Sequence, residues 1–410
     1  MRSDLGSSVR DVIPDVADLD RMGTERRAKL VRALADRDAG AVVLLGSTNV
    51  RWTTGARVVG ADQGRSARRR NVAVLVAGDS TPHLFSHFRE GVRADHPESH
   101  LHDGLDLDSD RGAAALVAFL EEHIDAGVRV LLDEWTMQLR RAWTARLPHV
   151  AVDDAAITLM GPLKLIKTRD ELACIRAAQH LNEQAMNDVY AALAPGVRQC
   201  DLSGLLLRRA FELGAHQNTV DPIWEVMPDS IAAGPRSVTG DLIFPTVTTD
   251  RVLGRGDVIW CDTGITVNGY DSDFGRTWTV GTDPTTAQRD QFRRWKDVID
   301  AVLAVTTPGA TGADLTRAAR QAYGPDRTPW LSHLYLAHGI GVDSAEAPFI
   351  GTDLGPAVDE SIVLAPGMVF VLEPIAWADG TGGYRGEEIV AVTETGYELL
   401  SDFNYEPYAS

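Results

Sequence analysis

The sequence CDTGITVNGYDSDFGRTW, residues 261–278, sets three aspartates around an Asn-Gly pair in a segment that otherwise resembles strand. Asn-Gly between two such stretches is a strong signal for a two-residue hairpin turn. That turn pairs residue 267 with 270, 266 with 271, 264 with 273 and 262 with 275. Because side chains alternate along strands, Asp262, Asp271 and Asp273 then share one face of the hairpin. Asp262 and Asp273 become diagonal neighbours, about 7–8 Å apart at the backbone.

Three carboxylates so close together repel one another, and two explanations are open. In the first, the hairpin tip is solvated and its acids are ordinary turn residues, which suits Asp271 beside the turn. In the second, the carboxylates hold one or two divalent cations. The second suits Asp262 better, because this residue ends the apolar strand VIWCD.

Three later segments carry further groups that can bind a metal ion. LAHGIGVDSAEAPF places His338 before a Gly-Ile-Gly turn, and GMVFVLEPIAW ends an apolar strand in Glu373. GGYRGEEIVAV begins another strand with Glu387 and Glu388. An ionised carboxylate at the end of an apolar strand is costly unless it is paired or bound to a metal. One imidazole and four carboxylates form a ligand set for Mn²⁺, Fe²⁺, Co²⁺ or Zn²⁺. The alternatives are a satisfied turn histidine at 338 and a Glu373–Arg385 ion pair.

The composition limits the possible partners. The chain has 410 residues and a net charge of -18, which argues against nucleic acid and against an anionic membrane surface. Three widely spaced cysteines give no disulfide framework. The first twenty residues lack the apolar core of a signal peptide, and no segment is long and apolar enough to span a bilayer. We therefore expect a cytoplasmic protein.

The hydrophobic pattern divides the chain into two parts. In the first part, apolar runs typical of buried strands alternate with helical patterns, as in a small α/β domain; the strands are expected at 41–45, 71–78 and 129–134, and the helices at 24–38, 112–124 and 137–147. Thr168 and Glu171 form a capping box for a long helix over 171–193, and a second helix follows at 201–213. Beyond about residue 240 we expect a mostly antiparallel sheet with interposed helices.

These segments, taken in order, resemble the pita-bread metallopeptidase superfamily in its prolidase, aminopeptidase P and creatinase branch. Asp262 and Asp273 lie in a stretch similar to the first ligand segment, His338 in one similar to the histidine segment, and Glu373 and Glu387 in two similar to the glutamate segments. The resemblance implies an α+β protein, with an N-terminal creatinase/prolidase-like α/β domain (1–158) and a C-terminal pita-bread catalytic domain (159–410). It also implies a homodimer.

The same resemblance implies a binuclear metal centre. Two divalent ions (Mn, Fe, Co or Zn) would be held by Asp262, Asp273, His338, Glu373 and Glu387, and would activate a bridging water for attack on an amide carbonyl. Glu373 would double as the proton shuttle. Arg385 would orient the Glu387 carboxylate.

The sequence departs from the family pattern at two histidines that contact substrate. The position seventeen residues before the first aspartate ligand is Pro245, and the position seven after the ligand histidine is Ala345. His333 lies near the place of an accessory histidine, although a structural role is also open to it. Tyr270 and Asp271 are candidates for replacement contacts to the substrate, with roles as turn residues as the alternative. Losing one group that stabilises an oxyanion typically costs about 10²–10³ in rate, so proline-peptide cleavage does not follow from the fold.

Three functions are therefore compared. The first is a metal-dependent hydrolase of the Xaa-Pro dipeptidase or aminopeptidase P type, acting on a small molecule or short peptide. The second is a non-peptidase of the same fold, either a lyase of the dimethylsulfoniopropionate type or a hydrolase similar to creatinase or ectoine hydrolase. The third is a non-catalytic binding module, which has no need of a complete ligand set.

Away from these segments, His96, His100 and His102 lie among acids in a segment that we interpret as a loop. There a solvated surface is favoured over a metal site.

Overall fold

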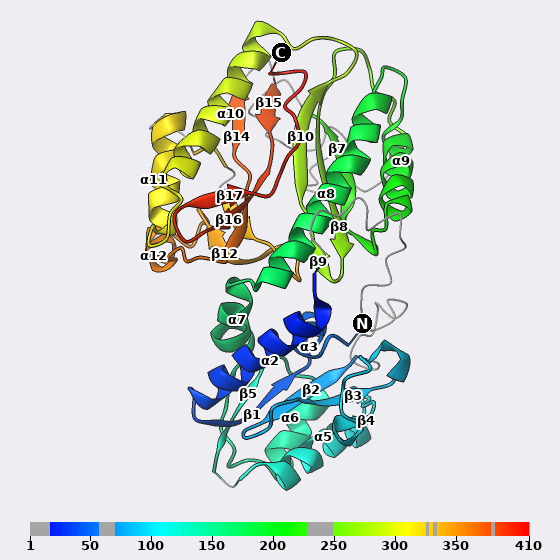
Figure 1. The fold of residues 1–410 in the computed structure, drawn as a ribbon, viewed down its shortest axis with the longest axis vertical. Coiled ribbons are helices and arrows are strands. Elements are labelled where there is room, and N and C mark those ends of the chain that lie inside the picture. The colour runs from blue at the N-terminus through cyan, green and yellow to red at the C-terminus, as the bar shows by residue number, and fades with distance from the viewer. Residues whose placement is uncertain are drawn as a thin grey trace. The chain divides into compact units, whose positions relative to one another are not determined.

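The computed structural model describes residues 17–56, 70–125, 127–227, 249–324, 328–330, 334–378 and 382–409. The chain forms two compact units and passes from the first to the second between Lys164 and Leu165. The domain limits expected from the sequence, 1–158 and 159–410, stay a prediction. The overall class is the expected one, an N-terminal α/β unit followed by a larger mixed α+β unit (Figure 1).

The N-terminal unit is built on a six-stranded mixed sheet with the order β4-β3-β2-β1-β5-β6. Its strands are β1 (Ala39–Leu44), β2 (Val72–Val76), β3 (His83–Ser86), β4 (Leu101–Asp103), β5 (Arg129–Leu132) and β6 (Val152–Asp154). Its helices are α2 (Leu19–Ala35), α3 (Ser47–Thr54), α5 (Asp110–His123) and α6 (Met137–Arg146), with short 3-10 turns η1 (Arg89–Gly91) and η2 (Glu98–His100). Side chains of the sheet, α5 and α6 form one hydrophobic core.

The sequence patterns located most of this unit. The three strands and three helices expected there correspond to β1, β2, β5, α2, α5 and α6, with ends that differ by a few residues. The short strands β3, β4 and β6 were not expected. β3 and β4 pair in parallel, with Phe85 opposite His102, so the segment interpreted as a loop contributes a sheet edge. The chain leaves the unit through a π-helical turn (Ala156–Met160) and α7 (Gly161–Leu165).

The C-terminal unit begins with α8 (Arg169–Ala192) and α9 (Gln199–Glu212). The predicted capping box is present, because the Thr168 side chain accepts from the Glu171 backbone N–H and the Glu171 carboxylate accepts from the Thr168 N–H. A first sheet has the order β10-β8-β7, and β9 also pairs with β8. Its strands are β7 (Gln217–Val226), β8 (Val258–Val267), β9 (Tyr270–Asp271) and β10 (Phe274–Thr279).

A second sheet of this unit has the order β12-β11-β13-β16-β17, and a separate ribbon pairs β14 with β15. The strands are β11 (Ala337–Gly339), β12 (Glu346–Ile350), β13 (Val369–Leu372), β14 (Ile375–Ala378), β15 (Gly382–Arg385), β16 (Glu388–Val392) and β17 (Tyr397–Leu399). The helices between and beside them are α10 (Thr286–Val305), α11 (Gly312–Tyr323) and α12 (Pro356–Ser361). The expected antiparallel pairing is confirmed in both sheets.

The hairpin at residues 261–278 has the predicted turn. Asn268 and Gly269 both have positive φ, 53° and 84°, as a primed two-residue turn requires. Val267 pairs with Tyr270, Thr266 with Asp271, and Asp262 with Gly275. Asp273 lies in the short gap between β9 and β10 rather than in a strand, so the expected pairing of 264 with 273 is not part of the ladder.

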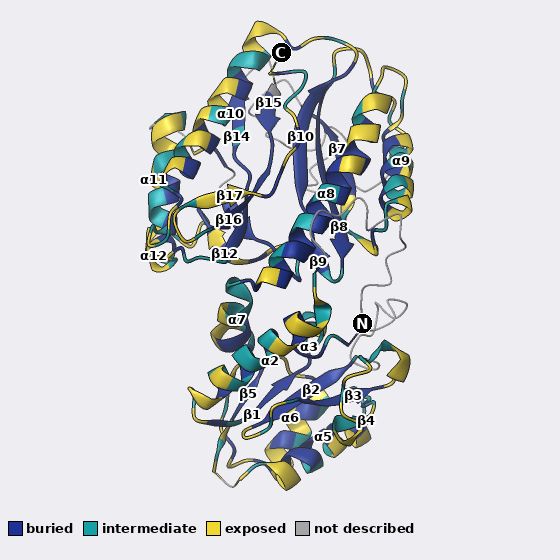
Figure 2. Ribbon diagram, in the orientation of Figure 1, coloured by how far each residue is buried: buried dark blue, intermediate teal, exposed yellow. Residues whose placement is uncertain are grey.

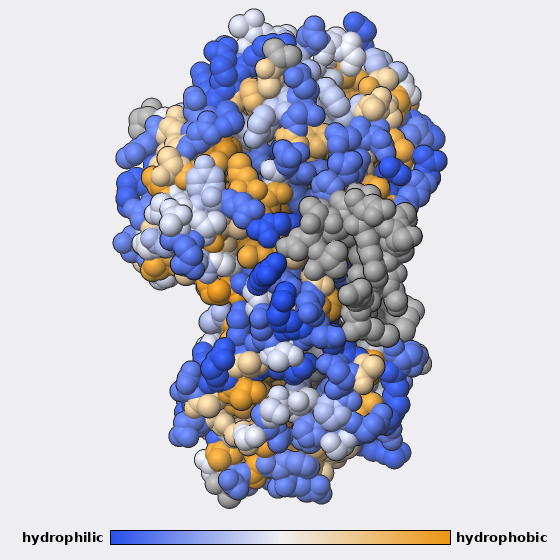
Figure 3. Space-filling model, in the orientation of Figure 1, coloured by the Kyte–Doolittle hydropathy of each residue, from blue (hydrophilic) through white to orange (hydrophobic). Residues whose placement is uncertain are grey.

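Two large hydrophobic cores and one smaller cluster support the described part of the C-terminal unit. The first core lies between α8, α9 and the β7–β10 sheet and includes Leu181, Trp278 and Phe403. The second core lies between α10, α11 and the β11–β17 sheet and includes Trp295 and Phe370. Figure 2 shows that the central strands of the sheets are mostly buried, whereas β17 and the outer faces of the helices are exposed. On the face drawn in Figure 3, hydrophilic residues cover most of each unit and hydrophobic ones form scattered groups. Among the described residues, no helix combines the length and apolar character needed to cross a membrane.

Candidate metal centre

The two sheets of the C-terminal unit bring together the five residues that the sequence singled out as metal ligands. Asp262 comes from β8 and Asp273 directly precedes β10, so the first sheet supplies both aspartates. From the second sheet, His338 lies on β11, Glu373 follows β13, and Glu387 directly precedes β16. All five side chains are buried.

The distances within this cluster are short enough for shared ions. Carboxylate oxygens of Asp262, Asp273 and Glu387 all lie within 4.8 Å of one another. His338 Nε2 lies 3.3 Å from Asp273 Oδ2 and 3.5 Å from Glu373 Oε1. Since Mn²⁺ and Zn²⁺ bind oxygen and nitrogen at about 2.0–2.2 Å, ligand atoms about 3–4.5 Å apart can meet at one ion.

The backbone sets the orientation of the histidine. His338 pairs with Val371 of β13 on one side and Phe349 of β12 on the other, which holds its backbone in the middle of the sheet. Its Nδ1 lies 2.9 Å from the Gly339 carbonyl oxygen. An Nδ1–H that donates there leaves the Nε2 lone pair facing the carboxylates, which is the tautomer that a metal ligand needs.

Among the described residues, Arg385 forms ion pairs with three of the four carboxylates of this cluster. Its guanidinium lies 3.2 Å from Asp262 Oδ2 and 2.8 Å from Glu387 Oε1, and also pairs with Glu373. The guanidinium carbon stacks 4.5 Å from the ring centre of Trp260, which fixes the side chain from the other side. The predicted contact between Arg385 and Glu387 is present in the structure.

The charges in the cluster do not balance. With all four carboxylates ionised, one guanidinium would leave three negative charges in a buried site. Burial, followed by the charges of Asp262 and Glu373, raises the pKa of Asp273 well above its usual range. Burial and then Asp262 likewise raise the pKa of Glu387. Among the described residues, Glu387 contacts the Arg385 guanidinium at 2.8 Å and the Asp273 carboxyl group. These are the features of a site that fits divalent cations, because positive ions would offset the repulsion between the clustered carboxylates.

The structure also separates the roles of two adjacent glutamates. Glu387 faces the cluster, whereas the Glu388 carboxylate pairs with Arg276 at 3.0 Å and accepts from the Tyr405 hydroxyl at 3.0 Å. Arg276 in turn donates to the backbone carbonyl oxygens of Gly275 and Glu387, at 2.9 and 2.6 Å. This buried network therefore fixes the backbone at Glu387, and with it the position from which the Glu387 side chain extends.

Two of the residues predicted to contact substrate, Tyr270 and Asp271, form hydrogen bonds inside the protein. The Tyr270 hydroxyl donates to Glu171 Oε1 at 2.5 Å, and Asp271 Oδ1 accepts from Thr219 and Thr266 at 2.9 and 2.7 Å. Both side chains are buried in these contacts, and their role in binding substrate stays a prediction. His333 and Pro245 lie outside the described residues, and Ala345 is exposed in the bend before β12.

Tyr335 is a candidate site residue that the sequence did not single out. Its ring lies 5.0 Å from the His338 ring, edge to face. Burial, followed by the charges of Glu373 and Asp273, raises the pKa of its hydroxyl, so the hydroxyl is protonated at neutral pH. The available signal was its position three residues before His338, in LYLAHG, but spacing alone does not distinguish such a tyrosine from a core residue.

Two families match this chain, one over each part. Residues 173–394 match the metallopeptidase family M24, and residues 26–160 match the creatinase/prolidase N-terminal domain. The first match includes all five clustered residues and spans more than half of the chain.

Individual relatives agree with these matches. The chain is 29% identical over 244 residues both to the uncharacterized peptidase YqhT of Bacillus subtilis and to an Xaa-Pro dipeptidase of Pyrococcus furiosus, in each case over 58% of this chain. The matched region spans 63% and 64% of the length of these relatives.

Solved structures extend the similarity in fold to both units. A prolidase from Pyrococcus horikoshii OT3 has a TM-score of 0.72 at 18% identity, covering 93% of this chain and 99% of that one. Dipeptidase PepE from Mycobacterium ulcerans has a TM-score of 0.73 at 22% identity, with 94% and 97% covered.

Proposed function

This chain belongs to the metallopeptidase family M24, and on that premise we propose that it is a metal-dependent hydrolase that cleaves an amide bond in a short peptide or similar small molecule. The observation that carries the proposal is the buried cluster of four carboxylates and one imidazole. These five side chains form a complete ligand set for divalent cations, which a protein that only binds peptides does not need. The non-catalytic module is therefore disfavoured.

Asp262, Asp273, His338, Glu373 and Glu387 are the proposed metal ligands. Two divalent ions held there would polarise the scissile carbonyl and lower the pKa of a water molecule. The metal identity is restricted by the donor set of carboxylates and one imidazole to Mn²⁺, Fe²⁺, Co²⁺ or Zn²⁺.

Glu373 is the proposed proton carrier. One of its oxygens lies 3.5 Å from His338 Nε2 while the other contacts Arg385, so the carboxylate is held between these two side chains. A carboxylate in that place can take a proton from the attacking water and pass it to the leaving amine. Arg385 acts through its contacts, because it holds the carboxylates of Asp262, Glu373 and Glu387 in fixed orientations.

Tyr335 is the proposed replacement for a missing histidine donor. Its protonated hydroxyl belongs to a ring that packs against His338, and a phenol can donate a hydrogen bond to a developing oxyanion. This role would offset part of the loss caused by Pro245 and Ala345 at the two usual histidine positions. The same two positions favour, as a second candidate, a non-peptidase of this fold acting on a small zwitterionic acid.

A substrate panel with the metal-loaded protein distinguishes these candidates. We expect hydrolysis of Xaa-Pro dipeptides, measured as released proline, in wild-type protein but not in His338→Ala. Turnover of betaine-like acids without turnover of any dipeptide would favour the second candidate. No metal bound after dialysis against Mn²⁺, in a protein with normal stability, would contradict both and favour the binding module.

A further inference from the structure

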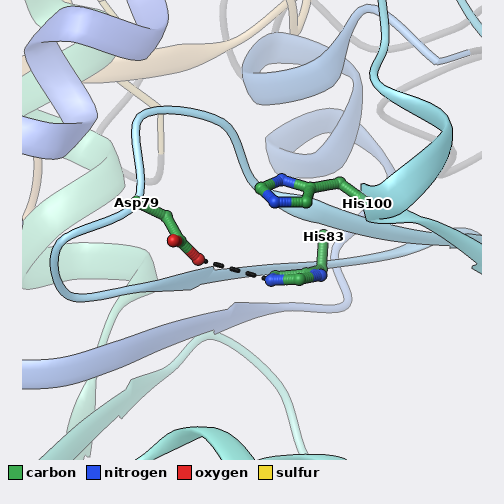
Figure 4. A group of neighbouring side chains, drawn as sticks. All are labelled: Asp79, His83 and His100. Atoms are coloured by element: carbon green, nitrogen blue, oxygen red, sulfur yellow. Dashed lines mark ion pairs between the residues drawn. The ribbon is translucent and has the colours of Figure 1, made fainter.

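A second group of metal-binding side chains lies in the N-terminal unit, where the sequence favoured a solvated loop. His83 begins β3, Asp79 lies in the turn between β2 and β3, and His100 ends the short η2 helix. The parallel pairing of β3 with β4 brings η2 beside β3. Figure 4 shows the His100 ring stacked over the His83 ring and the Asp79 carboxylate directed at the edge of the His83 ring.

The three side chains have the spacing of a small coordination site. Asp79 Oδ2 lies 3.3 Å from His83 Nε2. Two ligands at about 2.1 Å from a tetrahedral ion lie about 3.4 Å apart, so this pair already has the separation that a shared Zn²⁺ requires. The ring centres of His83 and His100 lie 4.1 Å apart, and one ligand atom of each of the three residues lies within 4.8 Å of the others.

The Nδ1 atom of each ring has a hydrogen-bonding partner, so Nε2 of each ring can serve as the metal ligand. His100 Nδ1 lies 2.9 Å from the Thr81 carbonyl oxygen, so Nδ1 carries the proton and Nε2 keeps its lone pair. His83 Nδ1 lies 2.9 Å from His102 Nε2, and donation to His102 leaves His83 Nε2 as a base facing Asp79. Metal-binding histidines characteristically have such a partner on the other ring nitrogen.

We propose that Asp79, His83 and His100 form a binding site for one Zn²⁺-like ion, separate from the candidate metal centre of the C-terminal unit. Two imidazoles and one carboxylate match the donor preference of Zn²⁺ and its neighbours rather than that of Mg²⁺ or Ca²⁺. Asp79 and His100 are partly exposed, so an ion can enter from solvent and a water can complete the tetrahedron. The site does not depend on the proposed hydrolase function.

Metal stoichiometry of the full-length chain tests the site. Stripped protein is dialysed against a fixed low concentration of free Zn²⁺, and bound zinc per chain is measured by mass spectrometry. Wild-type protein should bind one zinc more than Asp79→Asn or His100→Ala. His149, an exposed residue of the same unit, gives the matched control His149→Ala, which should retain the wild-type stoichiometry. Equal zinc content in all four proteins would overturn the proposal, whatever the C-terminal unit binds.

A second measurement uses only the wild-type chain, so it does not depend on the variants folding. Diethylpyrocarbonate acylates imidazole nitrogens that are free, and peptide mass spectrometry locates the product. Addition of Zn²⁺ should slow modification of His100 at least about 10-fold and leave His149 unchanged. Equal modification of His100 with and without Zn²⁺ would show that no ion binds there.

Discussion

Replacing Gly275 by alanine tests the position of the Glu387 carboxylate. Gly275 lies opposite Asp262 in the hairpin and its carbonyl oxygen accepts from the Glu387 backbone N–H at 3.0 Å. A Cβ at this position would lie 2.5 Å from Glu387 Cδ and 2.6 Å from its Oε1. The glycine therefore leaves the space that the carboxylate fills.

The size of the effect follows from these distances. Carbon atoms in contact lie about 3.5–4.0 Å apart, so the carboxylate in Gly275→Ala must retreat by about 1 Å. Glu387 is buried and its backbone is held by Gly275 and Arg276, which leaves the chain little freedom to compensate. A displacement of about 1 Å in a reactive geometry can cost about 100-fold. We expect metal affinity to fall by about that factor, or about 2.8 kcal/mol.

Isothermal titration calorimetry of the metal-free protein with Mn²⁺ measures this loss of affinity. Gly204→Ala is the matched control, because Gly204 lies on α9 and a Cβ there meets no atom within 4 Å. The control should keep wild-type affinity and gain about 1 kcal/mol of helix stability. If Gly275→Ala binds Mn²⁺ as tightly as the control, Glu387 is not a ligand in this arrangement and the reasoning fails.

Three further predictions concern the same site. His338→Ala should bind metal at least about 10-fold more weakly by the same calorimetry, and unchanged binding would remove the histidine from the ligand set. Tyr335→Phe should keep the wild-type metal content but lower kcat by about 10- to 100-fold if the hydroxyl stabilises the oxyanion; an equal kcat, with proline release as the assay, would leave it a packing residue. Because burial raises the pKa of Asp273 and Glu387, the folded metal-free protein keeps protons that the unfolded chain releases above about pH 4–4.5. Its free energy of unfolding in urea with chelator should therefore fall as the pH rises above that value, by about 1.4 kcal/mol per pH unit for each retained proton, and a flat profile would contradict the raised pKa values.

Local chemistry determined what the sequence could predict about the fold. The turn at Asn268-Gly269 and the capping box at Thr168 depend on residues a few positions apart, and both are confirmed. The hairpin register then followed for Val267 and Asp262, but not for Asp273, because the chain leaves the ladder between β9 and β10. Helices and strands were also predicted correctly where the apolar pattern extended over enough residues, as in β1 and α5, but not for the short strands β3, β4 and β6.

Contacts between segments that are distant in the chain could not be predicted from the sequence. The His83–His100 stack needs β3 and β4 to pair in parallel, and these strands are too short to give a clear pattern. Glu387 faces the cluster whereas Glu388 pairs with Arg276, and Arg276 is more than 100 positions away along the chain. Strand ends and turns pointed to the candidate ligands, and resemblance to a family completed the set of five; their roles, like the cytoplasmic location and the homodimer, stay predictions.

The candidate ligands come from two sheets that pack on different hydrophobic cores, and this has a consequence for metal preference. Asp262 and Asp273 are carried by the sheet that packs on the first core, and His338, Glu373 and Glu387 by the sheet that packs on the second. Ions of different radius demand bond lengths that differ by only a few tenths of an ångström. We therefore expect core residues such as Trp278 and Phe370, which are not among the candidate ligands, to influence the distance between the two groups of ligands. Directed evolution toward a larger or smaller ion should accumulate substitutions in these two cores as well as among the ligands themselves.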